Sequence, residues 1–423
     1  MMVEAEKVAM KDAYDVVVIG GGPAGCTVAA LVAEAGPSVL LVDRDVFPRF
    51  HIGESLMPEV YWPLKRLGLL EQMKERGFVR KLSVQFVSAS GKESQPFFFP
   101  EHDPRECSRT WQVERAEFDQ MMWDNAVAKG ADAHDGTRVL DVLFEGERAV
   151  GVRLKRGEEE AREVQAKVVV DATGLQALLA NRLGLREEDP ELKKVAIWSY
   201  FRGAARDPGD HGGGTIILHT QKRQSWFWFI PLKEDITSIG VVGDRDYLVR
   251  GRGAPEEVFE EELAICPALQ RRLEHAERTE KYFVAKEFSY STRQQAGDGW
   301  VLVGDALGFI DPIYSSGVFF ALKSGEMAAD TIVAALREGD TSAKRLGAWT
   351  SEFFSATRWI RKLVDAYYTD GFSFGHFLKM HPEHRGNLTD LLIGRIFHPE
   401  AGEIFDEMDP ELESVRRRAA AQG

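Results

Sequence analysis

Three glycines near the N-terminus have the spacing of a nucleotide-binding loop. Gly20, Gly22 and Gly25 follow a short apolar run at 15–19 and precede a segment at 23–34 that is rich in Ala, Val and Leu. In a strand–loop–helix unit the first glycine makes the tight turn, the second lets the backbone approach a pyrophosphate, and the third lets helix and strand pack closely. The pyrophosphate then lies at the positive end of the helix. We therefore predict a dinucleotide site at this loop.

An acidic residue stands where ribose recognition requires one. A second apolar run at 38–42 ends at Asp43, about 20 residues beyond the glycines, where a carboxylate accepts hydrogen bonds from ribose hydroxyls. The strand before the loop, the helix after it and the acid at this offset make the prediction more specific than the glycines alone.

Two later segments favour a flavin over a nicotinamide. Residues 167–174 form another apolar run that ends in small residues, and the run Trp300–Val303 leads to Asp305. An acid there can accept a hydrogen bond from a ribityl hydroxyl, and a helix that starts near Ser316 can direct its N–H groups at a flavin ring. This distribution resembles FAD-binding proteins of the two-domain aromatic-hydroxylase superfamily. An NAD enzyme usually completes its site within one contiguous domain.

Arg115, at the start of an expected helix, fits the same resemblance, in which an arginine reaches the FAD pyrophosphate or ribose. The alternative is a surface arginine that caps its own helix. The predicted FAD-binding residues are Gly20, Gly22, Pro23, Ala24, Gly25, Asp43, Arg44, Arg115, Asp305 and Gly317.

An aromatic cluster occupies the segment WFWFIP at 226–231. Each ring needs a large cavity, and each buried indole N–H needs a partner. Both faces of the implied strand would carry aromatic side chains, because successive residues of a strand point to opposite faces. The rings either fill the core of a central strand or form a rigid wall within a binding chamber.

Four segments together resemble the flavin-dependent halogenases. They are FPRFHIGESLMP at 47–58, GFVRK at 77–81, WFWFIP at 226–231 and GFIDPIYSSG at 308–317. The family's W-x-W-x-I-P signature is met at Trp226, Trp228, Ile230 and Pro231. The likeness is closer to the branch that acts on phenols and pyrroles than to the branch that acts on free tryptophan, and it covers about residues 14–330.

The resemblance implies a reaction and its partners. Reduced FAD, supplied by a separate flavin reductase, would react with oxygen and chloride or bromide to give hypohalous acid. The acid would pass through a tunnel to Lys81 and halogenate an electron-rich aromatic, a phenol or pyrrole that is free or bound to a carrier protein. The halide would bind at Ser316 and Gly317, where Ser316 can also be an ordinary helix cap. Trp226 and Trp228 would separate the flavin from the substrate.

The segment around Lys81 is expected to be a helix at 59–76 followed by a strand at 78–87. On such a strand Lys81 shares a face with Ser83 and Gln85, away from the apolar side chains. Lys81 therefore points either to solvent, as most such lysines do, or into a polar cavity, as the resemblance implies.

One position departs from the free-tryptophan branch. That branch carries a glutamate just before its halide turn, where this chain has Tyr314. The difference favours a substrate that is already activated, such as a phenol or a pyrrole. The alternatives are an FAD-dependent monooxygenase or reductase of the same superfamily, in which Lys81 and the tryptophans are structural, and a non-enzymatic FAD-binding sensor or scaffold.

The predicted fold is α/β, with a Rossmann-like FAD-binding domain, an interleaved and mostly antiparallel substrate-side sheet, and a C-terminal helical region. We assign 12–77, 109–185 and 290–335 to the FAD-binding domain, 78–108 and 186–289 to the substrate-side domain, and 336–423 to the helical region. Residues 141–170 are expected to form a small β-meander. The aromatic residues at 349–378 either fill the core or form a lid over the substrate.

The composition excludes several classes of protein. The formal net charge of -14 argues against nucleic acid as a partner. Cys26, Cys107 and Cys266 form no metal-binding spacing, and their odd number favours a reducing compartment. The sequence contains no signal-peptide pattern and no run of about 18 apolar residues that would span a membrane. We expect a cytoplasmic enzyme without a metal.

Overall fold

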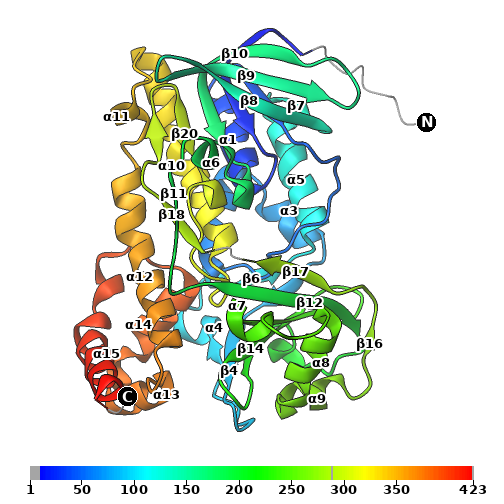
Figure 1. Ribbon diagram of the computed structural model, residues 1–423, viewed down its shortest axis with the longest axis vertical. Coiled ribbons are helices and arrows are strands. Elements are labelled where there is room, and N and C mark those ends of the chain that lie inside the picture. Colours follow the sequence, from blue (N-terminus) through cyan, green and yellow to red (C-terminus); the bar gives the residue numbers. More distant parts are fainter. Residues whose placement is uncertain (1–9, 287–288, 422–423) are drawn as a thin grey trace.

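The computed structural model describes residues 10–286 and 289–421. Two large sheets lie at opposite ends of the molecule in Figure 1, and the C-terminal helices run along one side of both. The first sheet is built around β1 (Ala13–Ile19), which pairs in parallel with β2 (Val39–Val42) and β10 (Arg162–Asp171). β10 pairs in turn with β20 (Trp300–Leu302). This is the predicted Rossmann-like sheet.

Further strands extend this sheet. Its order is β19-β20-β10-β1-β2-β7, with β7 at Asp132–His134 and β19 at Ala296–Gly297. β8 (Thr137–Glu145) and β9 (Arg148–Arg156) continue from β10 as an antiparallel meander. The predicted meander is therefore confirmed, and it belongs to the FAD-side sheet.

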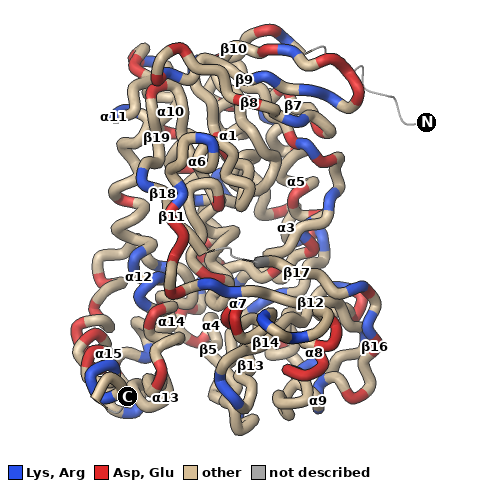
Figure 2. The backbone as a smooth tube through the Cα atoms, viewed as in Figure 1, with Lys and Arg blue, Asp and Glu red and all other residues tan. Residues whose placement is uncertain are grey.

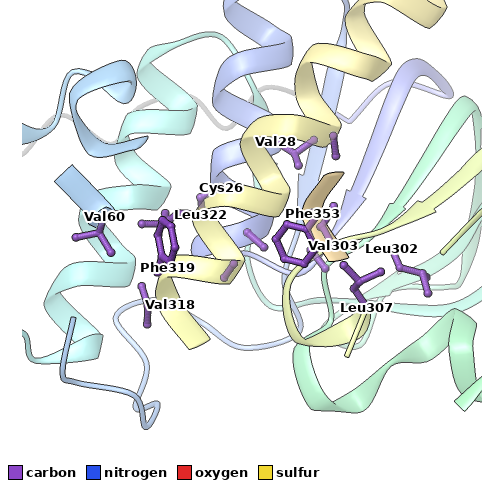
Figure 3. Close-up of a cluster of buried hydrophobic side chains, with 14 of the residues drawn as sticks. Cys26, Val28, Val60, Leu302, Val303, Leu307, Val318, Phe319, Leu322 and Phe353 are labelled. Atoms are coloured by element: carbon purple, nitrogen blue, oxygen red, sulfur yellow. The ribbon is translucent and has the colours of Figure 1, made fainter. Parts of the chain in front are cut away.

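Helix α1 (Pro23–Glu34) begins at the predicted proline and packs against α5 (Arg115–Ala128) and α10 (Gly317–Glu338). Figure 3 shows side chains of α1 and α10 meeting in this layer, among them Cys26 and Leu322. A helix that is apolar on all sides is stable only when it is buried, and the first ten residues of α1 are buried.

The second sheet has the order β16-β12-β15-β14-β13-β4-β5, and β17 also pairs with β12. All of its pairings are antiparallel except that of β4 with β13. The strands are β4 (Ser83–Val87), β5 (Phe97–Phe98), β12 (Lys194–Arg202), β13 (Thr215–His219), β14 (Ser225–Pro231), β15 (Ile236–Asp244), β16 (Glu277–Arg278) and β17 (Phe283–Lys286). The mostly antiparallel sheet was predicted.

Helices cover the outer face of the second sheet and form the C-terminal region. Phe227 and Phe229 of β14 pack in a cluster with Phe259 of α8 (Pro255–Ala264) and Leu269 of α9 (Pro267–Leu273). The remaining long helices are α12 (Thr350–Tyr368), α14 (Arg385–Ile393) and α15 (Phe405–Ala420). Shorter helices are α7 (Arg245–Leu248), α11 (Ala343–Leu346) and α13 (Phe374–Met380). The predicted domain boundaries stay predictions.

The expected helix and strand around Lys81 are both interrupted, so the prediction was wrong in this segment. The helix divides into α2 (Tyr61–Leu67) and α3 (Leu70–Glu75), because Gly68 adopts φ +78° and ends α2. The strand divides into β3 (Val79–Lys81) and β4. β3 pairs with β6 (Thr110–Gln112) in a separate small sheet, so Lys81 and Ser83 do not lie on one continuous strand.

The charged residues are interspersed along the backbone in Figure 2, with glutamates concentrated on α8. The three cysteines are buried and unpaired. Of the helices in the described residues, none has the length and apolar character that a transmembrane span requires.

Candidate active site

A cavity runs from the glycine loop to the second sheet. It has a volume of about 1500 Å³ including its open mouth, and its lining includes Gly20, Gly22, Asp305, Gly317 and Trp228. The first third, the middle and the last third of the chain therefore contribute, as the sequence predicts for a flavin.

Each glycine of the loop is needed for a different structural reason. Gly20 adopts φ +107°, and a Cβ there would lie 2.3 Å from the Ala172 carbonyl oxygen. A Cβ on Gly25 would lie 1.8 Å from the Gly20 oxygen, so this glycine allows the close approach of helix and loop. Gly22 is the N-cap of α1, has no capping side chain, and has room for a Cβ, which would meet only Arg49 at 3.6 Å. The uncapped helix N-terminus suits a pyrophosphate.

Asp43 has a role that the sequence did not indicate. Its carboxylate accepts hydrogen bonds from the backbone N–H groups of Gly21 at 2.7 Å and Asp45 at 2.9 Å, so it holds the glycine loop. It also lines the cavity, as does Arg44, whose guanidinium donates to Gln176. Contact of Asp43 with a ribose stays a prediction.

Arg115 lies at the first residue of α5, as predicted, and is buried rather than on the surface. Its guanidinium forms two hydrogen bonds with the Asp119 carboxylate and donates to the Ile52 carbonyl oxygen at 2.7 Å. Asp305 lines the same cavity, and loss of solvation raises its pKa to about 6. Both residues can therefore reach a cofactor in the cavity.

The loop 311–317 brings a helix N-terminus to the cavity. Ser315 adopts φ +58°, and α10 starts at Gly317. Ser316 occupies the N-cap position of α10, but its side chain makes no capping hydrogen bond. The N–H groups of the first turn have no intrahelical acceptor, so they can donate hydrogen bonds to an anion.

The inner face of the second sheet carries the two tryptophans of the signature. In register across the sheet, Trp198, Gly240, Trp228 and Ile217 form one row. A Cβ on Gly240 would lie 2.3 Å from the Trp228 ring, so the glycine lets the indole lie across the sheet and donate to Ser238 at 3.1 Å.

The two tryptophans have different surroundings. Trp228 and Trp198 line the cofactor cavity. Trp226 lies opposite His219, and its indole donates to the Tyr368 hydroxyl of α12 at 2.9 Å. Phe227 points to the opposite face, so the predicted two-faced strand is confirmed. The structure thus assigns only Trp228 of the pair to the cavity wall.

Lys81 is buried among polar side chains and does not point to solvent, with an exposed fraction of 3%. Its ammonium donates to Ser55 Oγ at 2.8 Å, and Ser55 in turn contacts Thr215 Oγ1 at 2.9 Å. Gln112 donates to the same Thr215 oxygen at 2.9 Å. Burial lowers the pKa of Lys81 to about 7, and no carboxylate among the described residues is bonded to its ammonium to oppose this shift. This lysine can therefore exchange a proton near neutral pH.

Lys81 does not line the cavity, but its polar partners lie near residues of the cavity wall. Thr215 stands two residues before Ile217 on β13, which is about 7 Å along a strand, and Ile217 belongs to the row of Trp228. Gly53, two residues before Ser55, lines the cavity. The polar partners of Lys81 therefore lie within two residues of the cavity lining at Gly53 and of the Trp228 row at Ile217.

Glu54 is a second buried ionisable group in this region, and sequence reasoning missed it. It accepts a hydrogen bond from the Tyr200 hydroxyl at 2.6 Å, and burial raises its pKa to about 7. Its neighbour Ser55 holds Lys81. The segment GES could have signalled both residues, because charged residues within an apolar segment are costly to bury without a function.

The comparisons with known proteins agree with this site. Residues 13–358 match the FAD binding domain family. A 1H-pyrrole-2-carbonyl-[peptidyl-carrier protein] chlorinase of Pseudomonas fluorescens is 32% identical over 95% of this chain and 94% of its own length. A brominase of the same carrier-bound pyrrole from Pseudoalteromonas luteoviolacea is 34% identical over 92% of this chain and 93% of its own length.

The chain belongs to the flavin-dependent halogenases. Its fold matches the structure of the flavin-dependent brominase Bmp2 with a TM-score of 0.86 and 32% identity, over 95% of this halogenase and 99% of the brominase. The halogenase is therefore an FAD-dependent oxidoreductase with a halide as co-substrate. The cavity fits FAD, because its lining combines the uncapped N-terminus of α1, Arg115 and Asp305. FAD supplies the oxidising chemistry when bound.

Proposed function

We propose that this halogenase converts an electron-rich aromatic to its chloro or bromo derivative in two separate compartments. The balanced reaction is Ar–H + X⁻ + FADH2 + O2 + H⁺ → Ar–X + FAD + 2 H2O. The halide is oxidised to hypohalous acid, and a C–X bond then replaces a C–H bond. Lys81 does not line the cofactor cavity, whereas Gly53, two residues before its partner Ser55, does, and this placement supports the division.

The site residues have separate tasks in this proposal. The N–H groups at Ser316 and Gly317 hold the halide beside the flavin. Trp228, bonded to Ser238, keeps the aromatic substrate out of the cofactor cavity. The amine of Lys81, held by Ser55, takes the halogen from hypohalous acid with release of water. It then passes the halogen to the ring carbon and regains the proton that the ring loses.

The substrate is a phenol or a pyrrole, and we favour a pyrrole-2-carbonyl group on a carrier protein. Two relatives that match almost the whole chain act on this carrier-bound pyrrole. Tyr314 is buried and donates to the Leu363 carbonyl oxygen, so the position offers no carboxylate to polarise an indole. We further propose that a separate flavin reductase supplies FADH2 and that the enzyme is cytoplasmic.

The reaction is tested by the mass of the product. The FAD-loaded enzyme is given chemically reduced flavin, oxygen, and bromide or chloride, with a panel of phenols and the carrier-bound pyrrole. We expect a product that gains one halogen in place of hydrogen. A product that gains one oxygen instead, with no dependence on halide, would establish a monooxygenase.

The halogenation rate should rise as pH increases through about 7. The pKa of Lys81 is lowered to about 7, so its amine is mostly protonated below this pH and mostly neutral above it. Only the neutral amine has a lone pair that can bond to the halogen. The measurement is single-turnover bromination from pH 6 to pH 8.5 at saturating bromide, with flavin oxidation followed in parallel. A rate that falls over the same interval would contradict transfer through the neutral amine.

A further inference from the structure

The halide turn is attached to the C-terminal helical region at two points. The hydroxyl of Tyr314 donates to the Leu363 carbonyl oxygen at 3.1 Å. The hydroxyl of Tyr368 donates to Asp311 Oδ1 at 3.3 Å. Leu363 and Tyr368 both belong to α12, so this helix contacts the turn through its own backbone and through a side chain.

Asp311 shapes the start of the turn. Its Oδ1 also accepts a hydrogen bond from the backbone N–H of Ile313 at 2.9 Å, and Ser315 N–H donates to the Pro312 carbonyl oxygen at 3.0 Å. Asp311 is 2% exposed, and its Oδ2 is buried without a hydrogen-bond partner among the described residues. The carboxylate is therefore oriented through Oδ1 alone, by Ile313 and Tyr368.

Tyr368 is held from two further directions. Its hydroxyl accepts a hydrogen bond from the Trp226 indole at 2.9 Å, and the ammonium of Lys194 lies 3.8 Å from the centre of its ring. Trp226 and Lys194 come from β14 and β12 of the second sheet. A chain of two hydrogen bonds thus runs from Trp226 through Tyr368 to Asp311.

We propose that Tyr368 is a positioning residue for halide binding, so that α12 and Trp226, the first tryptophan of the signature, set the geometry of the turn at 311–317. This inference rests on the proposed halide site at Ser316 and Gly317. It assigns Trp226 a function different from that of Trp228: Trp228 borders the cofactor cavity, whereas Trp226 orients Tyr368. It also assigns a function to the C-terminal region in halide affinity.

The test compares two tyrosines of the same helix. Tyr368→Phe removes the hydroxyl that links Trp226 to Asp311 and keeps the ring beneath Lys194. Tyr367→Phe is the matched control, because the Tyr367 hydroxyl is buried and has no hydrogen-bond partner among the described residues. KM for bromide, kcat and the Kd of FAD are measured for both FAD-loaded variants. Bromide binding without turnover is followed by quenching of flavin fluorescence.

We expect Tyr368→Phe to raise the bromide KM and the bromide concentration for half-quenching by about 5-fold, the effect of one lost hydrogen bond. Its kcat and FAD affinity, and all constants of Tyr367→Phe, should stay at wild-type values. The inference would be overturned if Tyr368→Phe and Tyr367→Phe had the same bromide KM and the same bromide concentration for half-quenching. A loss of kcat in Tyr368→Phe at unchanged bromide KM would also overturn it. If the wild-type enzyme forms no halogenated product from any substrate, the proposed function fails instead, and the quenching experiment still tests the turn.

Discussion

Lys81→Met should lower the rate of halogenation by about 1000-fold, a loss typical of a group that takes part directly in the chemistry, while oxygen still oxidises reduced FAD at the wild-type rate. The substitution keeps most of the side-chain volume and removes the amine that donates to Ser55. Because Lys81 does not line the cofactor cavity, flavin binding and its reaction with oxygen do not depend on it.

Two measurements separate this outcome from misfolding. Flavin oxidation is followed by absorbance, and the aromatic product by mass.

Ser55→Ala should reduce halogenation by only about 10-fold, because it removes one hydrogen bond to the amine and leaves the amine in place. Lys233→Met is a control that removes a lysine bonded to Glu117, away from the cavity lining. Loss of flavin oxidation together with halogenation in Lys81→Met would contradict the proposed role and indicate a structural one.

The local elements were predictable where neighbouring residues determine them. The glycine spacing and the apolar runs around it predicted β1, α1 and β2, because each residue's role depends on others within the same unit. The two-faced strand at 225–231 followed from aromatic residues at successive positions. Arg115 at the start of α5 was likewise placed correctly.

The surroundings of the site residues were not predictable from local patterns. Lys81 was expected on one strand with Ser83, but the chain changes sheets between them. Its partner Ser55 lies 26 residues earlier, and Ser55 contacts Thr215 across 160 residues. The sequence did not indicate that the Asp43 carboxylate accepts hydrogen bonds from backbone N–H groups of the loop, and its contact with a ribose stays a prediction. These contacts depend on tertiary packing, and a single sequence contains no signal that pairs such distant polar residues.

Gly22→Ala should produce a protein that folds normally and binds FAD about 100-fold more weakly. Gly22 has φ -76°, which any residue adopts, and its new methyl group would meet only the flexible end of Arg49 at 3.6 Å. The protein itself therefore has room for the methyl group. A pyrophosphate at the N-terminus of α1 would not leave that room, because the second glycine of the motif allows the backbone to approach it closely.

Gly25→Ala provides the contrast that locates the cofactor. Its methyl group would lie 1.8 Å from the Gly20 carbonyl oxygen, so this variant should lose stability whether or not FAD is present. The thermal midpoint of the FAD-free protein and the Kd of FAD, from flavin fluorescence, are measured for both. We expect Gly22→Ala to change only the Kd and Gly25→Ala to lower the midpoint. Wild-type FAD affinity in Gly22→Ala would mean that the pyrophosphate lies away from α1. The assignment of the N-terminus of α1 as the pyrophosphate site would then be wrong.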